Sequence, residues 1–169
     1  MRAIQIALSL VAIAAVTAVG ATAGAAAAPR AAQERDIVDT AVAAGKFKTL
    51  AKLLMRAGLV DALKQPGPYT VFAPTDRAFR RLPDEQLAAL KRNKRRLKAV
   101  LLYHVAPGRL LAEDVVRRSS VKTLNGQRVR ISLRESNVFL NRARVITPDV
   151  MASNGVIHVI NRVLSPPAR

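Results

Sequence analysis

The chain has 169 residues, enough for one ordinary domain, and it contains neither cysteine nor tryptophan. The absence of cysteine excludes disulfide scaffolds, thiolate metal sites, iron–sulfur ligation and cysteine nucleophiles. The formal net charge is +17, from 28 Lys and Arg against 11 Asp and Glu, and half of the residues are hydrophobic. This composition predicts a strongly basic folded domain and excludes a chain that is disordered throughout.

The N-terminal segment has the pattern of a secretory signal peptide. Arg2 gives it a positive start, an uncharged apolar run covers residues 3–19, and Ala26 and Ala28 fit the small-residue site of signal peptidase. We therefore expect residues 1–28 to be removed during export, residues 29–35 to form a mobile leader, and the mature chain to have no transmembrane segment. The alternative is an uncleaved membrane anchor, because the apolar run reaches the lower limit of spanning length.

Helical patterns begin the mature chain. Residues 36–44 and 46–57 are predicted to form two helices separated by Gly45, because apolar residues recur at helical spacing in the second. A helical turn at 59–63 and a Pro- and Gly-containing break precede a strand at 69–73, which is rich in β-branched and aromatic residues.

A second helical region follows this strand. Thr75 is a predicted N-cap, and the charge of Asp76 is favourable beside a helix N-terminus. Pro83 restarts a helix, and an apolar stripe then continues from Leu87 to Leu101.

The remainder of the chain is predicted to be β-structure. Asn125-Gly126 is a strong hairpin signal between strands at 121–124 and 127–133, and the second of these alternates apolar with basic residues. Further strands are expected at 138–140, 144–146 and 156–163, and the last is apolar on both faces, which indicates a central strand. Helices first and strands second predict an α+β fold.

Three stretches in this order resemble the motifs of the fasciclin-like domain. They are residues 69–79 (YTVFAPTDRAF), residues 102–105 (LYHV), and residues 152–160 (ASNGVIHVI) followed by Val163-Leu164. The resemblance extends over residues 36–166 and leaves residues 167–169 as a tail. It implies a fasciclin-like β-wedge of two sheets with helices packed along one side.

The same resemblance implies a function. Fasciclin-like domains are non-enzymatic modules of cell adhesion and the extracellular matrix, so we expect a secreted protein (extracellular, at the cell surface or periplasmic) with no enzymatic activity and no cofactor. Its partner would be a surface or matrix protein. The family's adhesion residues correspond here to Tyr103 and His104 and to the loop Pro148, Asp149, Val150 and Met151. In animal matrix relatives a pentapeptide at the position of residues 147–151 is tied to integrin recognition, although Thr147 replaces an acidic or amide residue.

The two histidines, His104 and His158, do not predict catalysis or metal binding. They are far apart in the sequence, with few carboxylates nearby, so neither a metal site nor a Ser-His-Asp arrangement is indicated. His158 is interpreted as a hydrogen-bonded core residue. Tyr103 and His104 have a structural alternative to adhesion, in which the rings are packed and their polar tips bind the backbone. Asp76 is interpreted as a helix-start charge and not as a catalytic acid.

Basic residues concentrate in two places. The first cluster comprises Lys91, Arg92, Lys94, Arg95, Arg96 and Lys98, and Arg77, Arg80 and Arg81 could extend it. The second cluster comprises Arg128, Arg130 and Arg134, and Arg142 and Arg144 could extend it. Each could be a solvated face that keeps the domain soluble, or a binding surface for acidic polysaccharide, lipopolysaccharide or anionic lipid. Nucleic acid is not an expected partner, because only 4% of residues are aromatic and the chain is expected to be exported.

Overall fold

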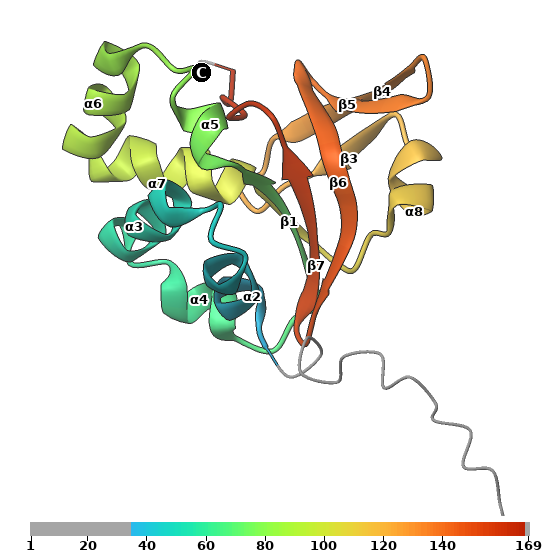
Figure 1. Ribbon diagram of the computed structural model, residues 1–169, viewed down its shortest axis with the longest axis horizontal. Coiled ribbons are helices and arrows are strands. Elements are labelled where there is room, and N and C mark those ends of the chain that lie inside the picture. The colour runs from blue at the N-terminus through green and yellow to red at the C-terminus, as the bar shows by residue number, and fades with distance from the viewer. Residues whose placement is uncertain (1–34, 168–169) are drawn as a thin grey trace, which may run out of the picture.

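The computed structural model describes residues 35–167 (Figure 1). The expected signal peptide, the leader up to residue 34, and residues 168 and 169 lie outside the described residues. Helices occupy most of the first part of the described chain and strands the second, as the α+β prediction requires.

The helical part contains two strands, and its elements have the following bounds: α2 (Ile37–Ala43), α3 (Lys48–Ala57), α4 (Val60–Lys64), β1 (Tyr69–Pro74), α5 (Asp76–Phe79), α6 (Asp84–Arg92), α7 (Lys94–Tyr103), β2 (Val105–Pro107) and α8 (Ala112–Val116). Thr75 is the N-cap of α5, as predicted, and its hydroxyl accepts a hydrogen bond from the backbone N–H of Ala78. The apolar stripe predicted from Leu87 to Leu101 spans two helices. They meet at Asn93, whose extended backbone ends α6 and whose side chain caps α7.

The later strands are β3 (Ser120–Lys122), β4 (Arg128–Arg134), β5 (Asn137–Leu140), β6 (Ala143–Ala152) and β7 (Gly155–Ile160). β3 and β4 form the antiparallel hairpin that Asn125-Gly126 predicts. The hydrogen-bonded order is β2-β1-β7-β6-β5-β4-β3, in which β1 and β7 are parallel. The backbone N–H of Leu124, just beyond β3, donates to the Val105 carbonyl of β2 at 2.7 Å. The two ends of the strand order therefore meet, and the sheet is nearly closed as a wedge.

Strand β7 is central, as its apolar sequence predicts. It pairs with β1 on one side and β6 on the other, and all six of its residues are buried. Ile157 and Val159 belong to a core shared with the helices, whereas Ile160 belongs to a second core shared with β4 and β5. In Figure 1 the helices α2–α7 lie on one side of β1 and β7, and β3–β5 lie on the other. The wedge therefore has one face covered by helices and one face folded onto its own strands.

Asn154 connects the start of the chain to the strands. Its side-chain oxygen accepts a hydrogen bond from the backbone N–H of Ile37 at 2.9 Å, and its amide nitrogen donates to the carbonyls of Leu63 and Gln65. The Asn-Gly pair that begins β7 in the sequence therefore also anchors α2 and the end of α4.

Candidate functional site

The predicted adhesion loop, residues 148–151, lies within strand β6. The pairing of β6 with β7 is irregular between Val145 and Val150, which produces a bulge. Pro148, Asp149 and Met151 are exposed there, and Val150 is half-buried. The segment is therefore an accessible surface feature on a strand and not a free loop.

Asp149 determines the conformation of this bulge. Its backbone has φ of 54°, in the left-handed region, where Asp is better tolerated than most residues. One carboxylate oxygen accepts a hydrogen bond at 2.8 Å from the N–H of Ala112, the first residue of α8, and its own N–H donates to Nδ1 of His158 at 3.3 Å. A carboxylate at a helix N-terminus is electrostatically favourable. Asp149 thus fixes the bulge against two neighbouring elements.

Tyr103 and His104 lie in the interior, with exposed fractions of 1% and 2%. The Tyr103 hydroxyl donates to the carbonyl of Arg128 at 3.0 Å and accepts from the side-chain amide of Asn141 at 3.1 Å. This is the arrangement of the structural alternative, with packed rings whose polar tips are hydrogen-bonded. The pair is not part of the accessible surface on which the bulge lies.

His104 connects the end of α7 to the C-terminal segment. Nδ1 lies 2.8 Å from the carbonyl of Val100, and Nε2 accepts a hydrogen bond at 2.9 Å from the N–H of Leu164. The proton of the neutral ring must therefore be on Nδ1. Burial lowers the pKa of His104 to about 4, against a smaller raising effect of the Val100 carbonyl, so the ring is neutral at physiological pH.

His158 is also a core residue, as predicted. Its Nε2 lies 2.7 Å from the carbonyl of Leu110, its Nδ1 accepts from Asp149, and its ring stacks on Phe72 with centroids 5.7 Å apart. Burial lowers its pKa, while the Leu110 carbonyl and the charge of Asp149 act in the opposite direction. Both ring nitrogens are occupied by internal partners, which leaves neither for a metal or a substrate.

Asp76 has a wider role than the helix-start charge that the sequence indicates. Its two carboxylate oxygens accept hydrogen bonds from the backbone N–H groups of Thr49 and Lys48, in the first turn of α3. Partial burial opposes ionisation, but these hydrogen bonds and the charge of Arg80 outweigh it and lower the pKa of Asp76. Asp76 therefore caps a helix other than its own and has no free carboxylate oxygen poised for catalysis.

The first basic cluster lies at the junction of α6 and α7. All six of its side chains are exposed. Among the described residues none of them forms a salt bridge, and the carbonyl of Lys91 accepts a hydrogen bond from the side chain of Arg56. Figure 1 shows α6 at one side of the molecule and β4 at the other, so the two basic clusters are separate surfaces.

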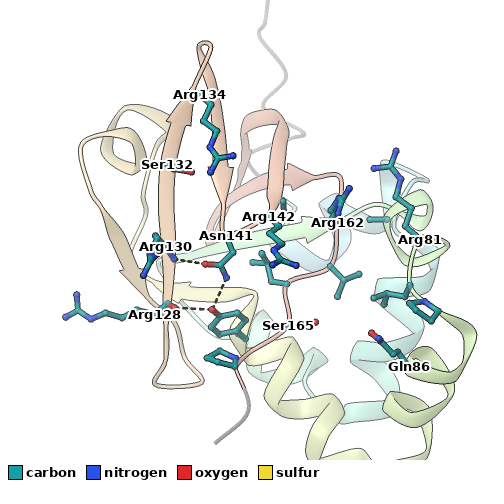
Figure 2. Close-up of a pocket in the computed structure, with 18 residues that line it drawn as sticks. Arg81, Gln86, Arg128, Arg130, Ser132, Arg134, Asn141, Arg142, Arg162 and Ser165 are labelled. Atoms are coloured by element: carbon teal, nitrogen blue, oxygen red, sulfur yellow. Dashed lines mark hydrogen bonds between the residues drawn. The ribbon is translucent and has the colours of Figure 1, made fainter.

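The second basic cluster forms one wall of a groove, which Figure 2 shows. The groove has a volume of about 1250 Å³. Strand β4 and the β5–β6 turn form one wall, the segment from α5 to the start of α6 forms the other, and the C-terminal segment lies between them. Six arginines line it: Arg81, Arg128, Arg130, Arg134, Arg142 and Arg162.

This grouping differs from the sequence interpretation in three arginines. Arg81 was grouped with the first cluster, yet it faces the same groove as Arg134. Arg142 joins the second cluster as expected, whereas Arg144 does not line the groove. Arg162 follows the last strand and was not recognised. The predicted last strand, residues 156–163, includes Arg162, whereas β7 ends at Ile160. A charged residue within a largely apolar run was therefore the one available signal that the strand ends before it.

The described residues contain no group of three or more His, Cys, Asp or Glu side chains that could hold a metal ion. Within residues 35–167, no helix has both the length and the apolar character needed to cross a membrane. A smaller cavity of about 180 Å³ lies beside the bulge, lined in part by Val145, Pro148 and His158.

Comparisons with known proteins agree with the fold and with the motifs. The family model described as the Fasciclin domain matches residues 45–166. The chain is 43% identical to the uncharacterized protein sll1735 of Synechocystis, an alignment that covers 76% of this chain and 96% of that protein. It is 37% identical to the transforming growth factor-beta-induced protein ig-h3 of Sus scrofa, over 78% of this chain but 19% of that much longer protein.

Solved structures give the same fold. A FAS1 domain pair from the insect cell adhesion molecule Fasciclin I superposes with a TM-score of 0.65 at 19% identity, covering 78% of this chain and 51% of that one. This likeness confirms the predicted wedge. The names of these relatives do not refer to polysaccharide, so the comparisons give no support to the polysaccharide alternative.

Proposed function

Because the chain belongs to the Fasciclin domain family, we propose that it is a secreted, non-enzymatic adhesion module that contacts a surface or matrix protein. The contact surface is the β6 bulge, residues 148–151. The observation that supports this choice is the rigid presentation of the bulge: Asp149 is bound to the N-terminus of α8 and to His158, while Pro148 and Met151 face solvent. Such preorganisation reduces the entropy lost when a partner binds.

Tyr103 and His104 act inside the fold. Their side chains are buried and bonded to Arg128, Val100 and Leu164. Their role in adhesion is to hold the wedge together, and a direct contact with a partner would require the wedge to open.

An adhesion assay tests the proposal. The exported protein is coated on a surface, and cells of the organism that encodes it are allowed to attach, with an inert coated protein as the baseline. We expect attachment above this baseline, and we expect Met151→Ala to reduce it. Met55→Ala is the matched control, because Met55 is 63% exposed but lies on α3, away from the bulge.

The outcomes test the adhesion function and the assignment of the contact surface separately. Attachment no better than to the inert protein would overturn the adhesion function. Attachment that Met151→Ala and Met55→Ala leave equally unchanged would overturn the assignment to the bulge. Asp149→Ala should also reduce attachment, but it alters the conformation of the bulge, so Met151 gives the clearer result.

Export is tested on the same protein. We propose that residues 1–28 direct secretion and are cleaved, which predicts that the mature protein is recovered outside the cytoplasm with an N-terminus at Pro29. Mass spectrometry of the exported and cytoplasmic fractions measures this. An intact N-terminus in a membrane fraction would support the anchor alternative instead.

A further inference from the structure

The groove beside β4, which we call the arginine groove, is lined by six positive charges. These charges form no internal ion pair among the described residues. Its six arginines come from four separate segments: the residues between α5 and α6, strand β4, the β5–β6 turn and the residues after β7. The salt bridges among the described residues involve Lys64 and Arg117, so none of the six is paired with an acidic side chain there. Asp84 and Glu85 begin α6 nearby but do not line the groove.

Like charges that gather without counter-charges repel one another, so the fold gains nothing from this arrangement. A few internal contacts hold individual side chains. Arg81 donates weakly to the carbonyl of Asn161 at 3.4 Å, and the guanidinium of Arg134 lies 5.7 Å from the ring centroid of Phe139. In Figure 2, Arg142 and Arg162 lie between the two walls. These contacts leave guanidinium donors free for a ligand.

The identity of the cations indicates the chemistry of that ligand. The lining contains six arginines and no lysine, although 8 of the 28 basic residues in the chain are lysines. A guanidinium presents its N–H groups as a planar fork that matches a carboxylate or phosphate, whereas an ammonium acts as a point charge. Ser132 and Ser165 add neutral hydrogen-bonding groups.

The remaining lining residues argue for an occupant with apolar parts. Leu82, Pro83, Val163 and Pro167 line the groove between the arginines. A small inorganic anion would not contact them, and the volume exceeds that of ordinary small-molecule pockets. A polysaccharide is favoured by exposed aromatic platforms, but the aromatic residue of the lining, Tyr103, is buried. A peptide that carries acidic and apolar side chains matches both parts of the surface.

We propose that the arginine groove binds an acidic segment of a partner protein, with its carboxylates on Arg81, Arg134, Arg142 and Arg162. The proposal deepens the proposed function and rests on it, because it takes the partner of the adhesion module to be a protein. The groove is a second contact surface, distinct from the β6 bulge. Charge-driven encounter through it would also accelerate association.

Fluorescence anisotropy tests the groove with a labelled peptide in which pairs of glutamates are separated by single leucines. A peptide with Gln in place of every Glu is its matched control. The groove variant carries Arg81→Gln, Arg134→Gln, Arg142→Gln and Arg162→Gln, all at exposed side chains. The control variant carries Arg92→Gln, Lys94→Gln, Arg95→Gln and Arg96→Gln, which removes the same charge at the α6–α7 junction.

We expect the acidic peptide to bind the native protein and the Gln peptide not to bind. The groove variant should bind the acidic peptide at least tenfold more weakly, because each charge-assisted hydrogen bond contributes substantially. The control variant should change affinity less than about threefold, because exposed charges beyond a Debye length of about 8 Å are screened at physiological ionic strength.

Equal weakening in both variants would overturn the proposal, since binding would then follow net charge alone. Binding of the Gln peptide with unchanged affinity would also overturn it. Two further probes distinguish other occupants: dextran sulfate and vesicles of phosphatidylglycerol. If the groove variant loses binding to either of these while the acidic peptide does not bind the native protein, the peptide proposal is wrong. Because the peptide assay needs no cells, failure here is distinguishable from failure of adhesion.

Discussion

Asp76, at the start of α5, accepts a hydrogen bond at 2.7 Å from the backbone N–H of Thr49, in the first turn of α3. Helix α3 has no side-chain cap of its own, because its N-cap position is occupied by Phe47. The backbone N–H of Asp76 also donates to the carbonyl of Lys46 at 2.9 Å. The segment after β1 thus caps the N-terminus of a helix whose Thr49 lies 27 residues earlier in the chain.

We expect Asp76→Ala to lower the free energy of unfolding by about 1–2 kcal/mol, the usual cost of losing a helix cap. Urea unfolding measures this. Asp84→Ala is the control, because Asp84 also begins a helix but its carboxylate makes no hydrogen bond to another described residue. An equal loss in the two variants would mean that the contact with α3 contributes nothing.

His104 should make the fold sensitive to mild acid. Its pKa in the folded protein is about 4, below the ordinary value of 6.5, so the unfolded chain binds more protons between these values. Stability is therefore fully present above about pH 6.5 and falls as the pH decreases towards 4, by about 3 kcal/mol from this ring. His158, whose pKa is also lowered, adds to the effect in the same direction.

Unfolding free energies measured between pH 4 and pH 7 test the His104 contribution. His104→Gln should be less stable at pH 7 but should lose less stability on acidification. Asp76 does not obscure the comparison, because both proteins contain it and the stability that its lowered pKa contributes is lost mainly below its ordinary value of 3.8. An unchanged slope in the variant would show that His104 titrates normally in the folded state.

The hydroxyl of Tyr103 should contribute measurably to stability. It donates to the Arg128 carbonyl and accepts from Asn141, so Tyr103→Phe removes two hydrogen bonds and leaves that carbonyl with one partner fewer. We expect a loss of about 1–2 kcal/mol in thermal or urea unfolding. Tyr69→Phe is the matched control, because the Tyr69 hydroxyl has no hydrogen bond to another described residue, and it should be nearly neutral.

Gly155 is required by the close approach of β1 and β7. A Cβ at this position would overlap the carbonyl oxygen of Tyr69 and lie 2.7 Å from Cδ1 of Ile37. Gly155→Ala should therefore destabilise the protein by about 3 kcal/mol, because a backbone atom cannot move away as a flexible side chain would. Gly45→Ala is the comparison, because Gly45 has a positive φ but open space around it. This substitution strains only the backbone conformation, so it should lower the free energy of unfolding by about 1–2 kcal/mol. The reverse order of the two losses would contradict this explanation.

Local patterns were sufficient for many elements. The hairpin at Asn125-Gly126, the N-cap Thr75 and the central strand β7 all depend on residues within a few positions of one another, and the structure contains all three. The interpretation of His158 as a core residue was also accessible, because its apolar neighbours on one strand face are visible in the sequence. The position at which the apolar stripe divides into α6 and α7 was less accessible, since Asn93 acts as a cap only when its own backbone is extended.

The candidate sites also divide into features with a local sequence signal and features that depend on tertiary contacts. The sequence by itself determined the family motifs and the excess of basic residues, because these are properties of short stretches and of composition, and the resemblance to the family then indicated the segment 148–151. Only the tertiary structure decided that Arg81 and Arg162 face the same groove as Arg134, and that Asp149 is held by α8. The physical reason is that such groupings depend on strand register and on how helices pack across the sheet, and residues eighty positions apart carry no local signal of either.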